Sequence, residues 1–291
     1  MNRVCGSGAQ AIVSAAHEIM MGSVARGRCG HRFGDGVLYD SVLRDGPNDA
    51  FSDEHSGWHT EDLVTKFQIG RGAQDEWALR SHQRFSAAQA AGKFGDEIVP
   101  VEVPGRKGPT KFMVDEHNRP DRTIEALSKL KPAFRGGGTI TAGNAPGLNT
   151  AAAAMVLASE AWADRHGLRP VARLVAYGIA AVEPGLFGLG PIPAVRQAVA
   201  RPGWTLGDVE RIEINEAFAV ITLAVQELGL SHEIVNVEGG AIAHGHPIGA
   251  TGAVLTTRLL HSMRRDGLKR GVVTTCIGGG QGIALAVELT A

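Results

Sequence analysis

A glycine-rich stretch with two histidines, residues 239–253, constrains this chain more than any other part of its sequence. A predicted strand over residues 234–237 leads into the stretch, and a predicted helix over residues 251–263 leads out of it. His246 lies between them and is followed by Pro247, whose fixed φ and missing N–H suit a first helical turn. The glycines let the backbone approach another group closely. A histidine on such a turn can reach a substrate, although a glycine-rich turn with a surface histidine explains the same pattern.

The composition is that of an ordinary globular protein of about two domains. Of the 291 residues, 44% are hydrophobic and 20% are charged, and the net charge of −1 gives no argument for a nucleic acid or membrane partner. The sequence has no apolar run of about eighteen residues and no signal-peptide layout, so we expect a cytoplasmic protein. Its three cysteines, an odd and small number, favour a reducing compartment with free thiols.

Strand and helix patterns alternate in the second half of the chain. The predicted strands cover residues 171–179, 209–214, 271–277 and 283–289, and the predicted helices cover residues 192–200, 216–228 and 251–263. A small-residue apolar run, residues 151–157, is predicted to be a buried helix or strand. This alternation predicts a largely parallel or mixed sheet covered on both faces, with ligands at the carboxyl ends of its strands.

The first half begins with a predicted helix over residues 7–22, preceded by Cys5. A thiol at a helix N-terminus favours the thiolate, while the alternative is a buried cysteine that acts as a small hydrophobe. Residues 26–131 are polar and rich in turns, which indicates a large insertion with little sheet. One strong helix is predicted there, over residues 71–91.

Other patterns in the insertion give weaker indications. The basic turn with Arg106, Lys107 and Lys111 is more typical of a solvated loop than of a phosphate site. The pairs His55 with His59, and Cys29 with His31, lack the further ligands that a metal site needs, so we expect no metal.

Four chemically active side chains fall where predicted strands end, and this favours a shared site: Cys5, Asn215, His246 and Cys276. Asn215 alone would be explained as a helix N-cap. Cys276 is followed by three glycines, whose N–H groups can form an anion nest or simply a tight hairpin turn.

Six motifs, spread in order over nearly the whole chain, carry a resemblance to a known family. They are Asn2-x-x-Cys5-Gly-Ser-Gly-x-Gln10-Ala, Thr141-Ala-Gly-Asn-Ala-Pro-Gly-Leu-Asn149, Gly190-Pro-Ile-Pro193, Asn215-Glu-Ala-Phe-Ala219, Gly239-Gly-Ala-Ile-Ala-x-Gly-His246-Pro-Ile-Gly-Ala and Cys276-Ile-Gly-Gly-Gly280-x-Gly. With these motifs the chain resembles the thiolase family of acetyl-CoA acyltransferases.

The resemblance implies an α/β fold with a thiolase-like α-β-α-β-α layering of two similar halves. Relative to the family, the two opening strands and a strand region after residue 22 are missing, so we expect an N-terminally truncated chain with an incomplete first half. The expected division is residues 1–25 and 133–166 for the incomplete N-terminal half, 26–132 for an inserted loop domain and 167–291 for the C-terminal half. An incomplete half is expected to be poorly formed or completed by another chain, because unpaired backbone groups are costly to bury.

The resemblance also implies a role for each residue of the shared site. Cys5 would be the nucleophile that accepts the acyl group, and His246 would take its proton. Cys276 would move the proton at the substrate α-carbon. Asn215 would hold a water that, with His246, stabilises one oxyanion, and the N–H groups of Cys5 and Gly278 would stabilise the other.

Coenzyme A is the co-substrate that the resemblance implies, with no permanently bound cofactor and with a homodimer or homotetramer as the assembly. The residues that would line the CoA tunnel and the acyl site are His55, Arg119, Phe134, the segment from Asn144 to Gly147, and Phe218.

Some positions depart from the family. Pro146 stands where the family often has serine, and Ser56 replaces a methionine known in some members. Asn149-Thr150 stands where Asn-Asp-Gly is common, and His244 replaces an aliphatic residue.

The sequence therefore predicts an acyltransferase of fatty acid metabolism. It would cleave 3-ketoacyl-CoA thiolytically, or run the reverse Claisen condensation, through an acyl-Cys5 intermediate. Two alternatives stay open at this point. One is a catalytically impaired protein that binds CoA esters or partners, and the other is a Cys-His-Asn thioester hydrolase, which would leave Cys276 without a task.

Overall fold

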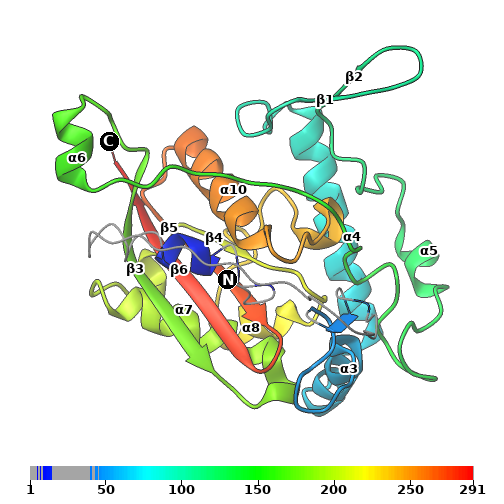
Figure 1. Ribbon diagram of the computed structural model, residues 1–291. Helices are drawn as coiled ribbons and strands as arrows, with labels where there is room; N and C mark the ends of the chain where they lie inside the picture. Colours follow the sequence, from blue (N-terminus) through cyan, green and yellow to red (C-terminus); the bar gives the residue numbers. More distant parts are fainter. Residues whose placement is uncertain are drawn as a thin grey trace, which may run out of the picture.

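The computed structural model describes Cys5, Ser7, residues 9–14, Asp40, Leu43, Arg44 and residues 46–290. In Figure 1 the C-terminal part forms a sheet flanked by helices, and helices and loops of the middle region pack at one side of it. Ser7 and residues 9–14 are helical, in agreement with the start of the helix predicted over residues 7–22. The remainder of that helix, Cys29 and His31 lie outside the described residues.

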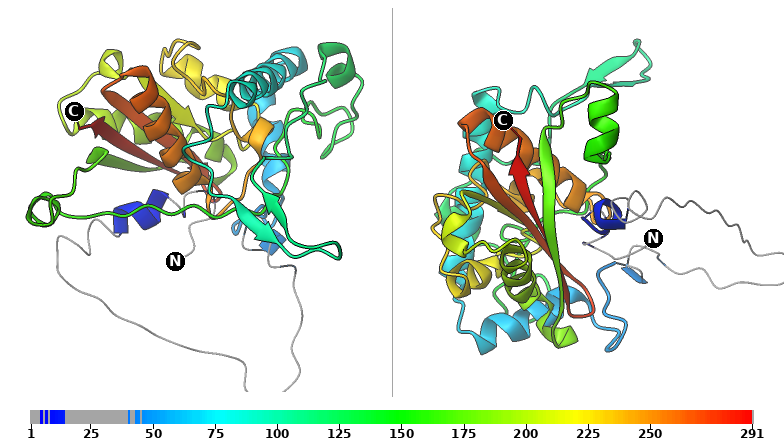
Figure 2. Two further views of the ribbon diagram at one scale, coloured as in Figure 1. Left: turned by 90° about the horizontal axis from the view of Figure 1, so that it is seen from above. Right: turned by 90° about the vertical axis from the view of Figure 1, so that its left-hand side faces the viewer.

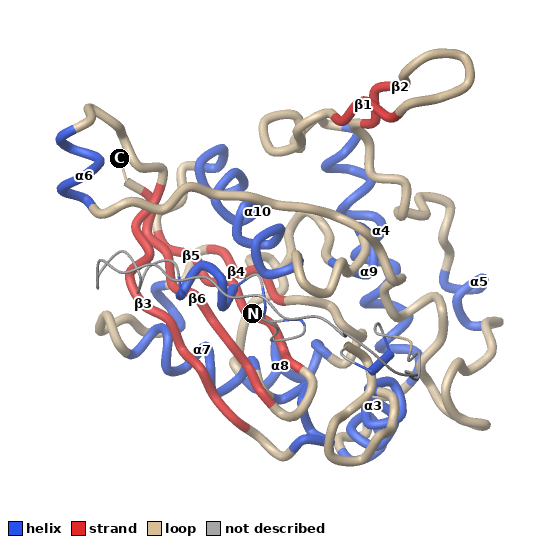
Figure 3. The backbone as a smooth tube through the Cα atoms, in the orientation of Figure 1, coloured by secondary structure: helices blue, strands red, loops and turns tan. Residues whose placement is uncertain are grey.

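The main sheet has four strands, β3 (Ala172–Ala181), β4 (Arg211–Ile214), β5 (Arg270–Ile277) and β6 (Gln281–Leu289), in the order β3-β6-β5-β4. Strand β6 runs antiparallel to both β3 and β5, whereas β4 runs parallel to β5. Figure 3 shows these strands side by side. The mixed sheet that the alternating pattern predicted is thus present, close to the predicted ranges.

Helices cover both faces of this sheet because side chains alternate along each strand. Val272 packs with apolar residues of α7 (Pro191–Ala200), while its neighbour Val273 packs with α10 (Thr251–Asp266) on the opposite face. The helical residues 9–14 lie beside the start of α10, where a Cβ on Gly252 would meet Ala9 (Figure 2).

Three glycines set the spacing between the backbones that surround the sheet. A Cβ on Gly178 of β3 would overlap the carbonyl of Ala194 in α7, and a Cβ on Gly282 of β6 would overlap the backbone of Gly190. Gly190 ends the short helix η2 (Pro184–Leu189) and caps α7. At each of these three glycines, the space that a Cβ would need is already filled by the backbone of a neighbouring segment. Only glycine therefore fits there.

The middle region contains α3 (Ser56–Lys66), α4 (Arg71–Ala90) and α5 (Ile124–Ser128), with one two-stranded sheet of β1 (Val101–Val103) and β2 (Thr110–Phe112). The helix predicted over residues 71–91 and the scarcity of sheet are confirmed in the part of this region that the structure describes. Helix α4 packs against α9 (Ala241–His244), within the glycine-rich stretch. The proposed division into three domains stays a prediction.

The helix predicted over residues 216–228 is shorter than expected, because α8 (Ile221–Glu227) starts five residues late. The reason is that residues before it bond to another segment, since the Ala219 N–H donates to the Asn144 carbonyl at 3.2 Å. Two further short helices complete the described part of the fold, α6 (Glu160–Arg165) and η3 (Leu206–Asp208).

The strand predicted over residues 234–237 is reduced to a single bridge between Val235 and Ile212. Asn236 has a positive φ of 44°, and its amide bonds to both the N–H and the C=O of Ile214, at 2.8 and 2.9 Å. The Asn236 side chain thus makes the hydrogen bonds to Ile214 that the backbone of a continuing strand would otherwise make.

The prediction for residues 151–157 is wrong, because this run is neither a helix nor a strand and is mostly exposed. Val156 is 95% exposed. The segment passes beside α10 in an extended form, and no strand among the described residues pairs with it. None of the helices in the described ranges combines the length and apolar character needed to cross a bilayer.

Candidate active site

The structure brings Cys5 and His246 together from opposite ends of the chain. The Cys5 Sγ lies 3.2 Å from the His246 Nε2, with Cys5 half-buried and His246 buried. This distance is that of a thiol–imidazole hydrogen bond, so the pair has the geometry of a nucleophile and its base.

Thr251, at the first position of α10, determines which nitrogen of His246 carries the proton. Its Oγ1 donates its one proton to the Pro247 carbonyl at 3.0 Å, and the His246 Nδ1 lies 2.7 Å from the same oxygen. In this arrangement the hydroxyl accepts from Nδ1–H, which leaves Nε2 unprotonated and facing the thiol.

The backbone of His246 is held by a second segment. The side-chain oxygen of Asn149 accepts from the His246 N–H at 3.1 Å, and Leu148 forms an isolated parallel bridge with His246. Asn149 in turn lies 3.3 Å from the Nδ1 of His117, in the middle region. The loop that follows Gly147 therefore positions His246 and also connects it to the middle region through His117.

Asn215 leaves the end of β4 directly beside this pair. Its Nδ2 lies 3.4 Å from the His246 Nε2, and its buried Oδ1 has no hydrogen-bond partner among the described residues. A small cavity of about 10 Å³ borders Asn215, Cys276 and Phe218. That volume is close to what one water molecule needs.

Cys276 lies near the end of β5 and is buried. It is close enough to Cys5 for the two sulfurs to interact electrostatically, and burial together with Cys5 raises the pKa of the Cys276 thiol well above its usual range. The glycine turn that starts at Gly278 joins β5 to β6, and Gly279 and Gly280 have positive φ. The sequence interpretation of a tight hairpin turn is therefore confirmed, and the anion nest at Gly278 stays a prediction.

Burial dominates the protonation states of the pair. Desolvation raises the pKa of the Cys5 thiol to about 12, despite a lowering contribution from its own backbone N–H. Desolvation also lowers the pKa of His246 to about 4. The expectation that a helix N-terminus makes Cys5 a thiolate stays a prediction, and the burial penalty on the charged thiolate acts against it. Both shifts favour a neutral thiol beside a neutral imidazole in the resting pair.

Three of the residues predicted for the CoA and acyl sites form one aromatic group. His55 stacks on Phe134 with ring centroids 4.8 Å apart, and Phe134 meets Phe218 edge-on at 6.1 Å. Gly57 makes room for the Phe134 ring on α3. Phe218 also borders the cavity beside Cys276, so this aromatic group adjoins that cavity.

The other predicted CoA residues are placed differently. Arg119 is exposed and its Nη1 donates to three carbonyls of its own loop. Asn144 is fully buried and bonds to Asp75 and Thr139, so its side chain braces the loop and does not reach a surface where CoA could lie. Gly147 lies against the His117 ring.

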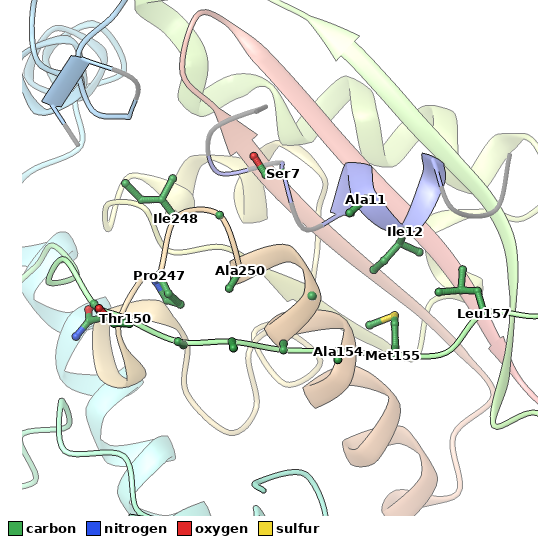
Figure 4. Close-up of a pocket in the computed structure, with 16 residues that line it drawn as sticks. Ser7, Ala11, Ile12, Thr150, Ala154, Met155, Leu157, Pro247, Ile248 and Ala250 are labelled. Atoms are coloured by element: carbon green, nitrogen blue, oxygen red, sulfur yellow. The ribbon is translucent and has the colours of Figure 1, made fainter. Parts of the chain in front are cut away.

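A wide apolar groove of about 790 Å³ runs beside the turn after His246 (Figure 4). Pro247 and Ile248 form one wall, residues 149–155 with Leu157 form another, and the helical residues Ala11 and Ile12 form a third. None of the described residues that line it is charged, so these residues offer no charged partner for the phosphates of CoA.

The histidines considered for a metal have other roles. The His55 Nδ1 accepts from the Gly57 N–H and caps α3, and the His59 Nε2 lies 2.7 Å from the Ser52 hydroxyl. Among the described residues, no three histidine, cysteine or acidic side chains gather in a way that could hold a metal ion.

Comparison with known proteins identifies the family. The model of the thiolase N-terminal domain matches residues 23–161, and that of the thiolase C-terminal domain matches residues 168–289. The chain belongs to the thiolase family. It has the thiolase fold, as a crystal structure of the Bacillus anthracis acetyl-CoA acetyltransferase superposes with a TM-score of 0.91 at 42% identity, covering 100% of this chain and 78% of that one.

Two further thiolase relatives bear on function. The cytosolic acetyl-CoA acetyltransferase of Mus musculus is 47% identical over 305 residues, covering 98% of this chain and 77% of its own. The human mitochondrial 3-ketoacyl-CoA thiolase, in a crystal structure with CoA, has a TM-score of 0.86 at 38% identity and covers 100% of this chain and 77% of its own. The alignment with the mouse protein is longer than the 291 residues of this thiolase, so some aligned positions have no counterpart here.

Sequence reasoning missed two residues of this thiolase site, Thr251 and Asn149. Both lie inside or next to motifs that were recognised, yet their contacts depend on how segments meet in space. One signal could have predicted the role of Thr251: it places a hydroxyl in the first turn of the helix that follows His246, within reach of the imidazole.

Proposed function

We propose that this thiolase transfers acyl groups between Cys5 and CoA, cleaving 3-ketoacyl-CoA with CoA or condensing two acyl-CoA molecules in reverse. The observation that carries the proposal is the 3.2 Å contact between the Cys5 Sγ and the His246 Nε2, with the second thiol, Cys276, beside them. A hydrolase needs only the first pair, whereas carbon–carbon cleavage also needs a proton donor for the carbon that leaves.

In the first half-reaction, His246 Nε2 takes the Cys5 proton as Sγ attacks the 3-keto carbon. The bond between C2 and C3 breaks, and the electron pair stays on C2. Cys276 gives its proton to C2, so that acetyl-CoA departs and Cys5 holds the shortened acyl group. A raised pKa keeps Cys276 protonated until the carbanion forms.

In the second half-reaction, the Cys276 thiolate takes the proton of CoA, whose sulfur attacks the acyl-Cys5 carbonyl. The Cys5 sulfur leaves and recovers its proton from His246. Both thiols and the imidazole then return to their starting states. The low pKa of His246 favours this return, because the imidazolium is the less stable form in a buried site.

Charge that develops on substrate oxygens is stabilised by fixed donors. Asn215 and a water in the adjoining cavity, together with His246, serve one oxygen, and the N–H groups of Cys5 and Gly278 serve the other. The unpartnered Oδ1 of Asn215 and the size of the cavity support this assignment.

Coenzyme A enters as co-substrate over the aromatic group of His55, Phe134 and Phe218. The CoA complex of the human relative supports this partner, and the cytosolic mouse relative supports a cytoplasmic location. We further propose a homodimer or homotetramer that acts in fatty acid metabolism.

One assay tests the proposal. Acetoacetyl-CoA consumption is measured with and without CoA, for the wild type and for Cys5→Ser. We expect turnover that requires CoA and is lost in Cys5→Ser. Turnover without CoA would indicate a thioester hydrolase, and binding without turnover would indicate a non-catalytic CoA-ester binder; either result contradicts the proposal.

A further inference from the structure

We infer that Glu216 is a positioning residue, whose buried carboxylate fixes Asn215 and the loop that carries His246 relative to each other. The inference rests on the proposed function of those two residues. Glu216 follows Asn215 in the chain, and it is 1% exposed.

Four donors from three segments converge on this carboxylate. On Oε1 they are the Trp77 Nε1 at 2.9 Å and the Asn236 Nδ2 at 3.1 Å, and on Oε2 they are the Ser81 hydroxyl at 2.8 Å and the Ile242 N–H at 2.9 Å. Among the ion pairs between described residues, none involves Glu216. Neutral dipoles therefore hold the carboxylate, and they come from three separate parts of the fold.

The loop before His246 is shaped to this contact. Gly240 leaves no room for a Cβ because the Glu216 carboxylate occupies that space, and the Gly240 N–H donates to the Ser81 hydroxyl at 2.9 Å. Gly239 has a positive φ of 79° and lies against α4 at Ser81 and Phe85. The glycine-rich stretch thus wraps around one acidic side chain.

Glu216 is connected closely to both Asn215 and the loop that carries His246. Asn215, one residue before it, is also held by its N–H bond to the Thr274 carbonyl at 2.9 Å. Ile242, four residues before His246, is held by Glu216 directly. The carboxylate therefore sets the spacing between the Asn215 amide and the imidazole.

Only an acceptor fits this site, because every group that faces it is a donor. A glutamine has the same shape but directs an NH₂ group at some of these donors. Glu216→Gln is therefore expected to shift Asn215 and the His246 loop without removing much volume.

The test compares two like substitutions on one strand end. Glu216→Gln is expected to lower kcat by about 10- to 100-fold with KM for CoA unchanged, the scale expected for misplaced catalytic groups. Glu213→Gln is the matched control, because Glu213 is also buried on β4 but has an unpartnered Oε2 and no bond to the His246 loop. It is expected to keep the wild-type kcat. Equal losses in both variants, or no loss in Glu216→Gln, would overturn the inference.

A second measurement separates this inference from the proposed function. The rate of Cys5 alkylation by iodoacetamide is followed by mass spectrometry over a pH series, which needs no turnover. In Glu216→Gln we expect slower Cys5 alkylation and a shifted pH profile, while Glu213→Gln keeps the wild-type profile. An unchanged profile in Glu216→Gln refutes the positioning role, even if the wild type proves to lack thiolase activity.

Milder variants cover the case in which Glu216→Gln does not fold. Ser81→Ala removes one donor to Glu216 and the acceptor for Gly240, and Trp77→Phe removes another donor. Each is expected to lower kcat at unchanged KM and to slow Cys5 alkylation, by less than Glu216→Gln. Wild-type values in both variants would overturn the inference.

Discussion

At Thr251 a single hydroxyl proton decides which nitrogen of His246 is basic. Thr251→Val keeps the shape of the side chain but removes the acceptor for Nδ1–H, so the imidazole loses its preference for the reactive tautomer. We expect acylation of Cys5 to slow by about 10- to 100-fold, within the range for a mispositioned general base. Mass spectrometry of the acyl-enzyme formed after mixing measures this rate.

Thr256→Val is the matched control for this prediction. Thr256 is buried on the same helix and its hydroxyl donates to the Gly252 carbonyl at 2.7 Å, but it does not contact His246. Thr251→Ser should keep the wild-type rate. Equal acylation rates in the two valine variants would contradict the assignment of the tautomer.

The pH dependence of Cys5 reactivity follows from the His246 pKa of about 4. A lowered pKa means that His246 stays neutral, and thus able to take a proton, until the pH falls well below 6.5. We therefore expect the acid limb of kcat/KM for thiolysis to lie near pH 4 to 5. A limb near 6.5 would show that the imidazole is solvated in the working enzyme.

At the scale of elements, the backbone contacts around the sheet are the least tolerant of change. Gly282→Ala inserts a methyl group into the backbone of Gly190 and is expected to destabilise the fold by about 3 kcal/mol or more. Gly72→Ala, on the exposed side of α4 with no atom nearby, should be neutral or stabilise by up to about 1 kcal/mol. Denaturant unfolding measures both, and similar values for the two would refute the close approach.

Strand β4 carries a pH-dependent contribution to stability. Burial raises the pKa of Glu213 from 4.5 to about 8, so the folded state holds its proton where the unfolded state has lost it. This contribution is complete below pH 4.5 and is lost as the pH rises through 8, on the order of a few kcal/mol. Glu97, with a pKa raised to about 7, acts in the same direction.

Glu213→Gln tests this contribution. The variant carries no proton to lose, so its Tm should fall less than that of the wild type between pH 5 and 9. Parallel Tm curves for the two proteins would mean that Glu213 is not desolvated.

The elements that the sequence predicted well are those whose pattern depends on local period. Helix α4 and strands β3 to β6 are of this kind. The late start of α8 and the loss of the strand at Val235 were not predictable, because the Asn144 carbonyl and the Asn236 amide compete for backbone groups only after folding. For the site, the motifs predicted that Cys5, His246 and Cys276 lie together. They did not predict the desolvation that raises the pKa of Cys5, because it depends on how distant segments pack.

At the scale of the whole molecule, exposed apolar side chains along one stretch support the proposed self-association. They include Leu148, Val156, Trp162, Leu168 and Val171. We expect light scattering to give a mass above that of one chain, and Val156→Lys to lower it. Val99→Lys is the control, because Val99 is 82% exposed but lies in a different region. Equal masses for both variants would contradict the assignment of this stretch to the interface.

The same stretch includes Asn149, whose side-chain oxygen accepts from the backbone N–H of His246. Whatever orders or displaces residues 149–157 therefore also acts on the imidazole that activates Cys5. Assembly and turnover are then linked through the side-chain amide of Asn149. On dilution, specific activity should decline in parallel with the loss of the oligomer. A dilution series in the standard assay would report the quaternary state through the rate alone.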